Sequence, residues 1–406
     1  MSLIVQKYGG SSVADADKIK NVARRIIKTC QAGHQVVVVV SAMGDTTDDL
    51  IKLAYQINKA PDERELDVLL STGELVASTL LTMALHEMGH QAISLSGAQA
   101  GIRTDTAYRQ ARIVKVEPRR VMEELSEGNI VVVAGFQGVT EEMDVTTLGR
   151  GASDLSAVAL AAVLKAERCE RYTDVDGIYT TDPRLLPEAR KLKDISYDEM
   201  LEMVTYGFKA IQPRAIELAE LYNVSLLVAS SFNDNPGTLI HKEVTMEVRN
   251  KVRGIAHDLD VAKITVVGVP DHPGIAAQIF VPLAKAGISV DTIVQNASIK
   301  NITDLTFTIA ESQVDSAMEV VKPIARAINA RECSSDTKWG KVSIIGSGMQ
   351  NAPGYAARMF DTLSKAGINI QLITTSEIRI TCIIEKAKVK DAVKALHDAF
   401  ELDKET

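Results

Sequence analysis

The chain has 406 residues, which is enough for two or three domains that each bury a core of their own. Hydrophobic residues make up 46% of it, aromatic residues only 4%, and the formal net charge is −8. This composition indicates a globular protein and argues against a bulk attraction to nucleic acid or to anionic membranes. The four cysteines, Cys30, Cys169, Cys333 and Cys382, lie too far apart for a zinc site and are expected to be reduced, buried thiols. No signal or transit peptide is recognisable, so a cytoplasmic protein is expected.

Apolar runs of strand length alternate with helical periodicity through the first two thirds of the chain. The runs cover residues 3–5, 36–40, 92–95, 130–133 and 225–228, and helix patterns include residues 16–28 and 155–165. Strands that are apolar on both faces predict a parallel sheet with helices on both sides, an α/β sandwich over residues 1–245. The turn-rich residues 232–237 close this region, and the charged segment 242–251 is the best candidate for a linker.

An internal repeat follows the linker. The run Pro273-Gly274-Ile275-Ala276-Ala277, which continues to Ile288, recurs from Pro353 to Ile368. Each copy has a strand before it, a Pro-Gly opening to a helix, a glycine that ends the helix, and then more strands. The pattern predicts two βαββαβ units over residues 262–335 and 341–406, and it is compatible with an exchange of the final strand between them. Such units can serve dimerisation alone, because a fold does not fix a function.

A glycine turn follows the first strand. The segment Lys-Tyr-Gly-Gly-Ser-Ser-Val, from Lys7 to Val13, leaves the strand and is expected to enter a helix near Ala14. Paired glycines allow backbone amides to approach phosphate oxygens, and a helix N-terminus adds a favourable dipole. Lys7 can then meet a phosphate as a point charge. A Gly-Gly turn alone is more often only a tight connection, so this motif needs the support of others.

Two further segments suit a carboxylate or phosphate ligand. Residues 41–47, Ser-Ala-Met-Gly-Asp-Thr-Thr, follow an apolar strand, so Ser41 and Thr47 emerge at the carboxyl edge of the sheet, where open α/β folds bind ligands. Asp45, Thr46 or Thr47 could instead cap the next helix. Residues 149–154, Gly-Arg-Gly-Ala-Ser-Asp, combine a guanidinium fork with amides at a helix start, where Ser153 or Asp154 could also cap.

Residues 173–184, Thr-Asp-Val-Asp-Gly-Ile-Tyr-Thr-Thr-Asp-Pro-Arg, end a strand, turn on Asp-Gly and carry three carboxylates. Such a segment can hold the edge of a nucleotide and compensate metal-bound phosphates, although clustered carboxylates are more commonly a solvated turn. A lone lysine, Lys209, follows. Two lysines far apart in sequence can bracket a transferring phosphoryl group. Glu74, in Ser-Thr-Gly-Glu, could have a purely structural role in the first turn of a helix, where the helix dipole stabilises a carboxylate.

Taken together, these segments and the duplicated module resemble the aspartate kinases of the amino-acid kinase family, from Lys7 to about Glu385. The resemblance implies an amino-acid kinase sandwich followed by two ACT domains of ferredoxin-like fold, the modules by which amino-acid enzymes sense end products. It implies that the γ-phosphoryl group of ATP, with Mg²⁺ on its phosphates, is transferred to the β-carboxylate of L-aspartate. The products would be 4-phospho-L-aspartate and ADP, in the first step toward lysine, threonine and methionine. A carboxylate is already ionised at neutral pH, so no general base is needed.

The resemblance also assigns roles to individual residues. Lys7, Asp154 and Lys209 would be catalytic, with Asp154 orienting the two lysines. Glu74 would receive the α-ammonium group of aspartate and Arg150 its carboxylate, in a substrate set of Ser41, Thr47, Glu74, Arg150, Gly151, Ala152 and Ser153. The ATP set would be Lys7, Tyr8, Gly9, Gly10, Ser11, Thr173, Asp174, Val175, Tyr179, Thr180, Asp182, Pro183, Arg184, Lys209 and Ala210. Mg²⁺ would be held by the ATP phosphates, and no side chain is assigned to it.

Feedback inhibition by threonine, with or without lysine, is a further implication of the resemblance. The effector set would be Asp271, Pro273, Gly274, Ile275, Ala276, Ala277, Asp291, Thr292, Gln295 and Asn296 in the first ACT unit, and Asn369, Ile370, Thr375, Ser376 and Glu377 in the second. Edge strands of such units pair readily with another copy, so pockets completed between subunits are expected. The expected assembly is a homo-oligomer, or an α2β2 form whose smaller chain starts at Met246.

Several positions depart from the family pattern. Ala152 stands where relatives have a second glycine, and alanine would be strained there if the position requires a positive φ. Phe208 replaces a small residue, and Ala229 stands where relatives often place arginine; either change could tune nucleotide affinity. Residues 350–352, Gln-Asn-Ala, depart from the usual approach to the second repeat.

Three other functions are compatible with part of the sequence. Another amino-acid kinase, acting on acetylglutamate, glutamate or a nucleotide, shares the lysine and glycine motifs. A non-catalytic amino-acid sensor would keep the repeat and lose the kinase lysines, yet both lysines are present. An NAD-dependent enzyme would need Gly-x-Gly-x-x-Gly after its first strand, where this chain has Lys-Tyr-Gly-Gly-Ser-Ser.

Overall fold

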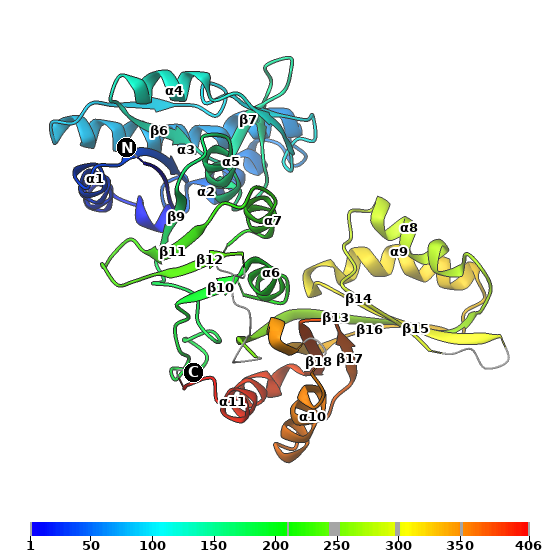
Figure 1. Cartoon of the computed structure of the whole chain (residues 1–406). Helices are drawn as coiled ribbons and strands as arrows, with labels where there is room; N and C mark the ends of the chain where they lie inside the picture. Colours follow the sequence, from blue (N-terminus) through cyan, green and yellow to red (C-terminus); the bar gives the residue numbers. More distant parts are fainter. Residues whose placement is uncertain (1, 209–210, 243–251, 297–300, 350–351, 405–406) are drawn as a thin grey trace. The chain divides into compact units, whose positions relative to one another are not determined.

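The computed structural model describes residues 2–208, 211–242, 252–296, 301–349 and 352–404 (Figure 1). Lys209, Ala210, Met246 and the pair Gln350-Asn351 lie outside the described residues, as does most of the predicted linker. The chain forms two compact units. The first unit consists of Met1–Tyr179, Lys191–Val204 and Lys209–Met246, and the second unit of Thr180–Arg190, Thr205–Phe208 and Glu247–Thr406.

An eight-stranded sheet forms the centre of the first unit. Its order is β10-β12-β11-β9-β1-β2-β6-β3, and its strands are β1 (Leu3–Tyr8), β2 (Gln35–Val40), β3 (Ala92–Leu95), β6 (Ile130–Ala134), β9 (Arg168–Thr173), β10 (Asp194–Ser196), β11 (Leu226–Ser230) and β12 (Thr238–His241). Neighbouring strands are parallel except for β11 and β12. The run from Val36 to Val40 is buried on both faces, as expected for a central parallel strand. A four-stranded sheet of order β5-β4-β7-β8 is formed by β4 (Ile102–Thr104), β5 (Ile113–Val116), β7 (Gln137–Val139) and β8 (Val145–Thr147).

Helices cover both faces of the eight-stranded sheet. The helices of this part of the chain are α1 (Ala16–Gln31), α2 (Thr46–Ile57), α3 (Glu63–Glu87), α4 (Arg119–Ser126), α5 (Ser153–Val163), α6 (Tyr197–Thr205) and α7 (Pro213–Tyr222). Alternate residues of β1 point to opposite faces: Gln6 hydrogen-bonds to Thr29 of α1, whereas Lys7 pairs with Asp154 of α5. The predicted α/β sandwich is therefore confirmed, with α1 and α3 packed together on one face and α5 on the other.

The long helix α3 is a core helix of the first unit. Its length and composition alone would allow it to cross a membrane, but half of its most apolar stretch is buried inside the protein. It also carries the buried carboxylates of Asp67 and Glu74. Asp67 accepts hydrogen bonds from the backbone amides of Arg109 and Thr147, and so fixes the segment that leads to Arg150.

The second unit contains one six-stranded antiparallel sheet of order β14-β15-β13-β16-β18-β17. Its strands are β13 (Gly254–Pro270), β14 (Thr292–Gln295), β15 (Ile302–Ile309), β16 (Glu332–Ile345), β17 (Leu372–Thr375) and β18 (Arg379–Glu385). The two predicted repeats share this sheet because β13 and β16 run through both halves. Residues 254–258, which precede the first repeat, pair with residues 341–345 of the second, so the second repeat receives a strand from outside its own segment.

Each repeat has a hydrophobic core of its own. The helices α8 (Ile275–Lys285) and α9 (Val314–Ala327) share one core with β13 and β15, and α10 (Tyr355–Lys365) and α11 (Val389–Ala399) share another with β16 and β18. Figure 1 shows the first pair in yellow and the second in orange and red. Gly274 and Gly354 precede α8 and α10 with φ values of 93° and 103°, so the Pro-Gly openings use the left-handed conformation that favours glycine.

Two short segments from before residue 210 belong to the second unit. Thr180 accepts a hydrogen bond from the backbone amide of Ile255 at 2.6 Å, and its hydroxyl lies 2.9 Å from Nε2 of the buried His397. Gly207 has a φ of 121°, and a Cβ added there would lie 1.9 Å from the carbonyl oxygen of His257. These close contacts tie both short segments to the part of the second unit that contains Ile255, His257 and His397. The division into domains at residues 245, 262–335 and 341–406 stays a prediction.

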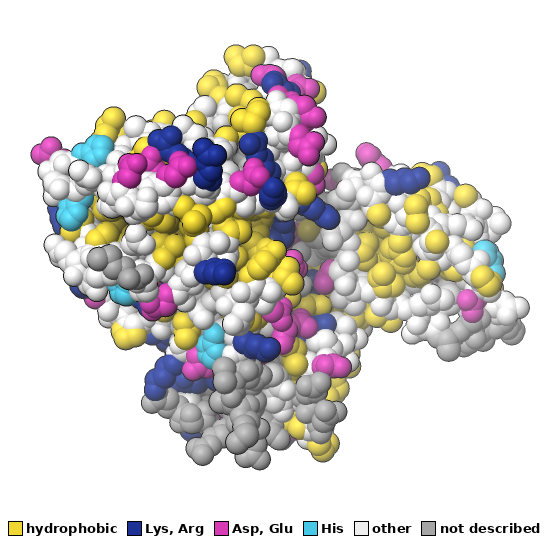
Figure 2. Space-filling model, turned by 45° about the horizontal axis from the view of Figure 1, so that its top comes forward, with side chains coloured by type: hydrophobic (Ala, Val, Ile, Leu, Met, Phe, Trp, Pro, Cys, Tyr) yellow, Lys and Arg dark blue, Asp and Glu magenta, His cyan; other side chains and the backbone are white. Residues whose placement is uncertain are grey.

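Charges of both signs are interspersed on the surface. On the face shown in Figure 2, Lys and Arg side chains lie among Asp and Glu side chains rather than in a continuous basic field.

Candidate active site

The glycine turn after β1 lies against the turn after β2. Gly9 donates its amide to the carbonyl of Tyr172 at 3.2 Å, and the amide of Gly44 bonds to the carbonyl of Gly10 at 3.1 Å. A Cβ at Gly10 would lie only 2.8 Å from the carbonyl oxygen of Ala42. Glycine at position 10 therefore allows the two turns to meet at the carboxyl edge of the sheet.

The expected helix near Ala14 is confirmed, although it begins slightly later in the chain. A short 3₁₀ turn, Gly10–Ser12, follows the glycines, and α1 begins only at Ala16. Its N-cap Asp15 accepts a hydrogen bond from the amide of Lys18 at 2.9 Å, so the helix end is already capped by a carboxylate. An anion bound at this turn would therefore contact loop amides and Lys7 rather than the start of α1.

Lys7 and Asp154 form a buried ion pair that a second cation shares. Lys7 Nζ lies 2.7 Å from Asp154 Oδ1, and Arg171 donates Nε to Asp154 Oδ2 at 3.0 Å. Burial lowers the pKa of Lys7, while the Asp154 carboxylate opposes this effect. Although burial alone would raise the pKa of Asp154, Arg171 and Lys7 together hold that pKa below its usual value. The structure thus brings together two of the three predicted catalytic residues, and Lys209 lies outside the described ones.

Sequence reasoning missed Arg171. It stands beside Lys7 in the register of β9 and β1, so both side chains project to the face covered by α5. The available signal was an arginine inside a strand whose neighbours Cys169, Glu170 and Tyr172 are all buried. A charged side chain in such a strand needs a partner, and here the partner is Asp154.

Glu74 is the best candidate for binding a cationic group. It lies in the middle of α3, so the reading as a first-turn residue stabilised by the helix dipole is wrong. Glu74 Oε1 accepts a hydrogen bond from the amide of Ala42 at 3.1 Å, while Oε2 is buried without a partner among the residues that the structure describes. Burial raises the pKa of Glu74 to about 7, and the nearby Lys7 charge opposes this shift. A buried carboxylate with one free oxygen is suited to an ammonium group.

The glycine-rich segment 149–154 presents Arg150 at the surface. Gly149 and Gly151 have φ values of 95° and 77°, whereas Ala152 has a φ of −76° and precedes α5. Alanine at position 152 is therefore not strained, and the suspected cost of this departure is absent. Neither Ser153 nor Asp154 is the N-cap, because both lie inside α5. Arg150 is 86% exposed and donates Nη2 to both carboxylate oxygens of Asp48, at 2.7 and 2.8 Å. A substrate carboxylate could replace that of Asp48.

Ser41 and Thr47 flank the same turn. The backbone amide of Ser41 donates to the carbonyl of Tyr8 at 3.1 Å, and both Ser41 and Thr47 are partly buried. Thr47 lies in the first turn of α2, whose N-cap Asp45 makes no side-chain capping bond among the described residues. Thr46 instead donates its hydroxyl to the carbonyl of Met43 at 2.6 Å. The proposed capping role of Asp45 is thus not observed.

The predicted nucleotide segment is divided between the two units. Thr173, Asp174, Val175 and Tyr179 belong to the first unit, where Asp176 accepts from the Tyr179 hydroxyl at 2.6 Å and pairs with Lys191 at 3.3 Å. Thr180, Asp182, Pro183 and Arg184 belong to the second unit, where Asp182 pairs with Arg184 at 2.9 Å. Among the residues predicted to bind ATP, Lys7 and Gly9 therefore lie in the same unit as Thr173. Residues 180–184 belong to the other unit.

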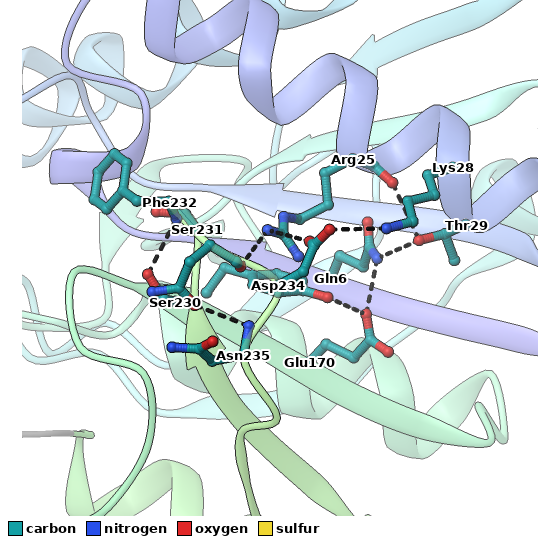
Figure 3. Close-up of polar contacts among 12 residues, drawn as sticks. Gln6, Arg25, Lys28, Thr29, Glu170, Ser230, Ser231, Phe232, Asp234 and Asn235 are labelled. Atoms are coloured by element: carbon teal, nitrogen blue, oxygen red, sulfur yellow. Dashed lines mark hydrogen bonds and ion pairs between the residues drawn. The ribbon is translucent and has the colours of Figure 1, made fainter.

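A buried polar network supports the turn from the other face of the sheet (Figure 3). Gln6 donates to Glu170 at 2.8 Å and to Thr29 at 2.9 Å, and the hydroxyl of Tyr172 donates to Glu170 at 3.0 Å. The ring of Tyr8 stacks on that of Tyr172 at 5.0 Å, so the Tyr8 side chain belongs to the core and only its backbone can face a nucleotide.

The segment after β11 joins this network to the glycine turn. Ser231 bonds through its hydroxyl to Ser12 at 2.8 Å and through its amide to the carbonyl of Thr173 at 2.8 Å. Arg25 and Lys28 of α1 pair with Asp234 at 3.1 and 3.0 Å, as Figure 3 shows. Strands β1, β9 and β11 are thereby fixed to one another where they end.

The predicted effector residues lie in the second unit. Thr292 and Gln295 are in β14 and Thr375 is in β17, the two strands at the edges of the six-stranded sheet. Gly274 precedes α8, with Ile275, Ala276 and Ala277 in its first turn and Asp271 and Pro273 in the loop before it. Asp291 forms an ion pair with the buried Lys341 and accepts from the hydroxyl of Thr308 at 3.1 Å. Asn296 directly follows β14, and Asn369, Ile370, Ser376 and Glu377 flank β17.

Comparisons with known proteins agree with this architecture. The model of the amino acid kinase family matches residues 2–230, and that of the ACT domain matches residues 264–323 and 342–400. The aspartate kinase of Pseudomonas putida is 50% identical over 405 residues, which cover 99% of this chain and 98% of that protein.

Solved structures show the same likeness. The crystal structure of E. coli aspartokinase III in complex with aspartate and ADP, described as an R-state, covers 98% of this chain and 99% of its own at 25% identity, with a TM-score of 0.82. The T-state of that enzyme with lysine and aspartate gives a TM-score of 0.77 at the same identity and coverage. The chain therefore belongs to the amino acid kinase family and carries two ACT domains after its kinase region.

Proposed function

We infer that this chain is an aspartate kinase, which transfers the terminal phosphoryl group of ATP to the β-carboxylate of L-aspartate. The observation that carries this inference is the buried carboxylate of Glu74, with one oxygen free, near the buried Lys7–Asp154 pair. One site thus offers a carboxylate, Glu74, for a cationic group of a ligand and a lysine, Lys7, for an anionic group. Relatives named aspartate kinase, 50% identical over nearly the whole chain, support the same reaction.

Glu74 fits the α-ammonium group of the amino acid. Its free oxygen is buried, so a charge-assisted hydrogen bond there would be strong and would also remove the cost of an unpaired buried carboxylate. Arg150, on the exposed side of the same region, would exchange its bond with Asp48 for one with a substrate carboxylate. These two contacts would align the zwitterionic substrate. We propose that the other predicted substrate residues, Ser41, Thr47, Gly151, Ala152 and Ser153, contribute to the same pocket.

Phosphoryl transfer to a carboxylate needs positioning and charge neutralisation rather than a general base. Lys7, under the glycine turn, would neutralise charge that develops on the transferring group, with Asp154 fixing its orientation. Lys209 is proposed for the same task. The loop amides around Gly9 and Gly10 fit phosphate oxygens, because neither position carries a side chain.

ATP with Mg²⁺ is the proposed phosphoryl donor. The E. coli enzyme, which shares the fold over nearly its full length, was solved with ADP, and this supports the choice of nucleotide. Mg²⁺ bridging the phosphates would supply charge neutralisation. The exposed carboxylate of Asp174, at the end of β9, fits a place beside such a bridged phosphate group.

Regulation through the ACT domains is also proposed. The two edge strands β14 and β17 carry predicted effector residues and leave backbone groups available for pairing with a second copy. We propose threonine, with or without lysine, as inhibitor, a homo-oligomeric or α2β2 assembly, and a role in cytoplasmic amino-acid biosynthesis. The lysine complex of the E. coli enzyme supports an amino-acid effector.

One substrate panel tests the proposed reaction. ATP consumption is measured with aspartate, glutamate, acetylglutamate and UMP in parallel, and aspartate is expected to be the substrate with by far the highest kcat/KM. Preference for any other acceptor would point to a different amino-acid kinase. Absence of turnover with all four, together with binding of threonine, would favour the non-catalytic sensor.

A further inference from the structure

The guanidinium of Arg171 has an unused donor inside the active site. Its Nε is bonded to Asp154, yet its Nη1 is buried and has no partner among the residues that the structure describes. The Arg171 side chain as a whole is only 15% exposed. Leaving a buried charged donor unpaired is costly, so such an atom in an active site is suited to a ligand that supplies the acceptor.

The charges of the cluster indicate which kind of ligand fits. Lys7 and Arg171 are two cations, and they share the single carboxylate of Asp154. A Lys7–Asp154 pair alone would be neutral, whereas the three groups together keep an excess of one positive charge. A buried excess charge is stabilised by a counter-charge, and the fitting ligand atom is therefore an anionic oxygen.

The position of Arg171 associates it with the phosphate site. Arg171 is aligned with Lys7 in the pairing of β9 and β1, and the position of a Cβ on Gly9 would lie 3.8 Å from Lys7 Nζ. The neighbouring Glu170 and Tyr172 are engaged on the opposite face, where both belong to the network around Gln6 (Figure 3). Arg171 is thus the residue of this strand that extends the cationic site of Lys7.

We propose that Arg171 is a further nucleotide-binding residue, which donates Nη1 to an oxygen of the terminal phosphate of ATP while Nε holds Asp154. The proposal rests on the kinase function proposed above. Glu74 Oε2 is also buried without a partner among the described residues, but it is an acceptor and suits the ammonium group of aspartate. Arg171 Nη1 therefore suits the phosphoryl donor, ATP, and Glu74 Oε2 suits the phosphoryl acceptor, aspartate.

A ligand series separates this role from a purely structural one. Binding of ATP, AMP and adenosine is measured by calorimetry for the wild type, Arg171→Met and Arg171→Lys. We expect Arg171→Met to bind ATP about 10- to 100-fold more weakly, the range for loss of one charged hydrogen bond, with AMP and adenosine unchanged. Arg171→Lys keeps the charge but has one nitrogen where the guanidinium uses two, Nε and Nη1, to reach Asp154 and phosphate. It should therefore lie between the wild type and Arg171→Met, and it serves the test if Arg171→Met does not fold.

Arg168→Met is the matched control, because Arg168 lies on the same strand and, among the described residues, its side chain bonds only to Glu167 and Glu170. It should bind all three ligands like the wild type. Equal losses for ATP and AMP in the Arg171 variants, or a raised KM for aspartate with unchanged ATP affinity, would overturn the proposal. A wild type that binds ATP but does not phosphorylate aspartate would refute the proposed function, while the binding series would still decide the role of Arg171.

Discussion

The guanidinium carbon of Arg379 lies 3.8 Å from the ring centroid of Tyr206, in a cation–π contact within the second unit. The ammonium group of Lys341 approaches the same ring at 5.8 Å and also pairs with Asp291, a predicted effector residue. Tyr206 precedes Lys209 by three positions in the sequence. A change in the charge of Asp291 would therefore alter the contacts of a residue close in sequence to a proposed catalytic lysine.

Asp291→Ala is expected to relieve inhibition by threonine, alone or with lysine, while sparing basal activity. Allosteric couplings are typically about 1 to 3 kcal/mol, so the inhibitory concentration should rise about 5- to 150-fold. Because this change leaves the buried Lys341 unpaired, the double variant Asp291→Ala with Lys341→Met is measured alongside it. Identical inhibition curves for wild type and variant, or no inhibition of either, would leave the repeat as a dimerisation device.

Lys7→Ala is expected to lower kcat by at least about 100-fold, the scale for losing one preorganised electrostatic group. Asp154 keeps its bond to Arg171 in this variant, so the fold should persist and thermal unfolding should change little. Lys18→Ala, at a partly exposed lysine of α1 that pairs with Asp15, is the control and should leave kcat unchanged. A Lys7→Ala enzyme with near-normal kcat would show that Lys7 does not act on the transferring group.

Glu74 should make aspartate binding depend on pH. Its pKa is raised to about 7 by burial, so the free enzyme carries a neutral Glu74 at pH 6 and an ionised one at pH 8. The ammonium group of aspartate binds the ionised form, and the KM for aspartate should therefore fall as the pH rises from about 6 to 8. Glu74→Gln should raise this KM, remove its pH dependence over that range and leave the KM for ATP close to the wild-type value. Equal losses for both substrates would place Glu74 outside the aspartate pocket.

The raised pKa of Glu74 also makes the free energy of unfolding depend on pH, and the contribution of Glu74 to that free energy falls as the pH rises. Near neutral pH the folded protein binds more protons at Glu74 than the unfolded chain does, so its contribution to the free energy of unfolding decreases between about pH 4.5 and pH 7. Glu74→Gln has no such titration. The difference in unfolding free energy between variant and wild type, measured by denaturant titration, should therefore shift in favour of the variant as the pH rises through this window.

Gly151→Ala and Ala152→Gly form a matched pair of backbone tests. Gly151 has a φ of 77° with no atom within 4 Å of an added Cβ among the described residues, so alanine there costs conformational strain of about 1 kcal/mol and no steric clash. Ala152 has a φ of −76°, so glycine there relieves nothing. We expect Gly151→Ala to lower kcat/KM for aspartate and Ala152→Gly not to increase it. A gain of activity in Ala152→Gly would show that the loop changes conformation during turnover.

The architecture was predictable where local signals were strong. The buried runs around Val36 to Val40 and the repeated Pro-Gly openings at Gly274 and Gly354 specify their elements directly, because burial on both faces and a left-handed glycine leave few alternatives. The family-like motifs also pointed to Lys7, Glu74 and Asp154, whose functional roles stay predictions. These residues lie in the first unit, with Lys7 paired to Asp154 and close enough to Glu74 to influence its pKa.

The remaining features depend on contacts between distant segments, which a single sequence does not reveal. Arg171 can be recognised as part of the site only from the register of β9 against β1, which places it beside Lys7. Thr180 looks like part of one continuous nucleotide loop, yet its contacts with Ile255 and His397 place it in the second unit. The exchange that pairs residues 254–258 with residues 341–345 is likewise set by tertiary packing.

The most direct test of the account is the capture of its product. The wild-type protein is incubated with ATP, Mg²⁺, L-aspartate and hydroxylamine, which converts an acyl phosphate into a hydroxamate, and aspartyl hydroxamate is quantified against ADP. The account predicts about one hydroxamate for each ADP with aspartate, and a loss of at least about 100-fold in the rate of both with Lys7→Ala. ADP release without hydroxamate, or hydroxamate formed equally well by Lys7→Ala, would contradict phosphoryl transfer to aspartate at this site.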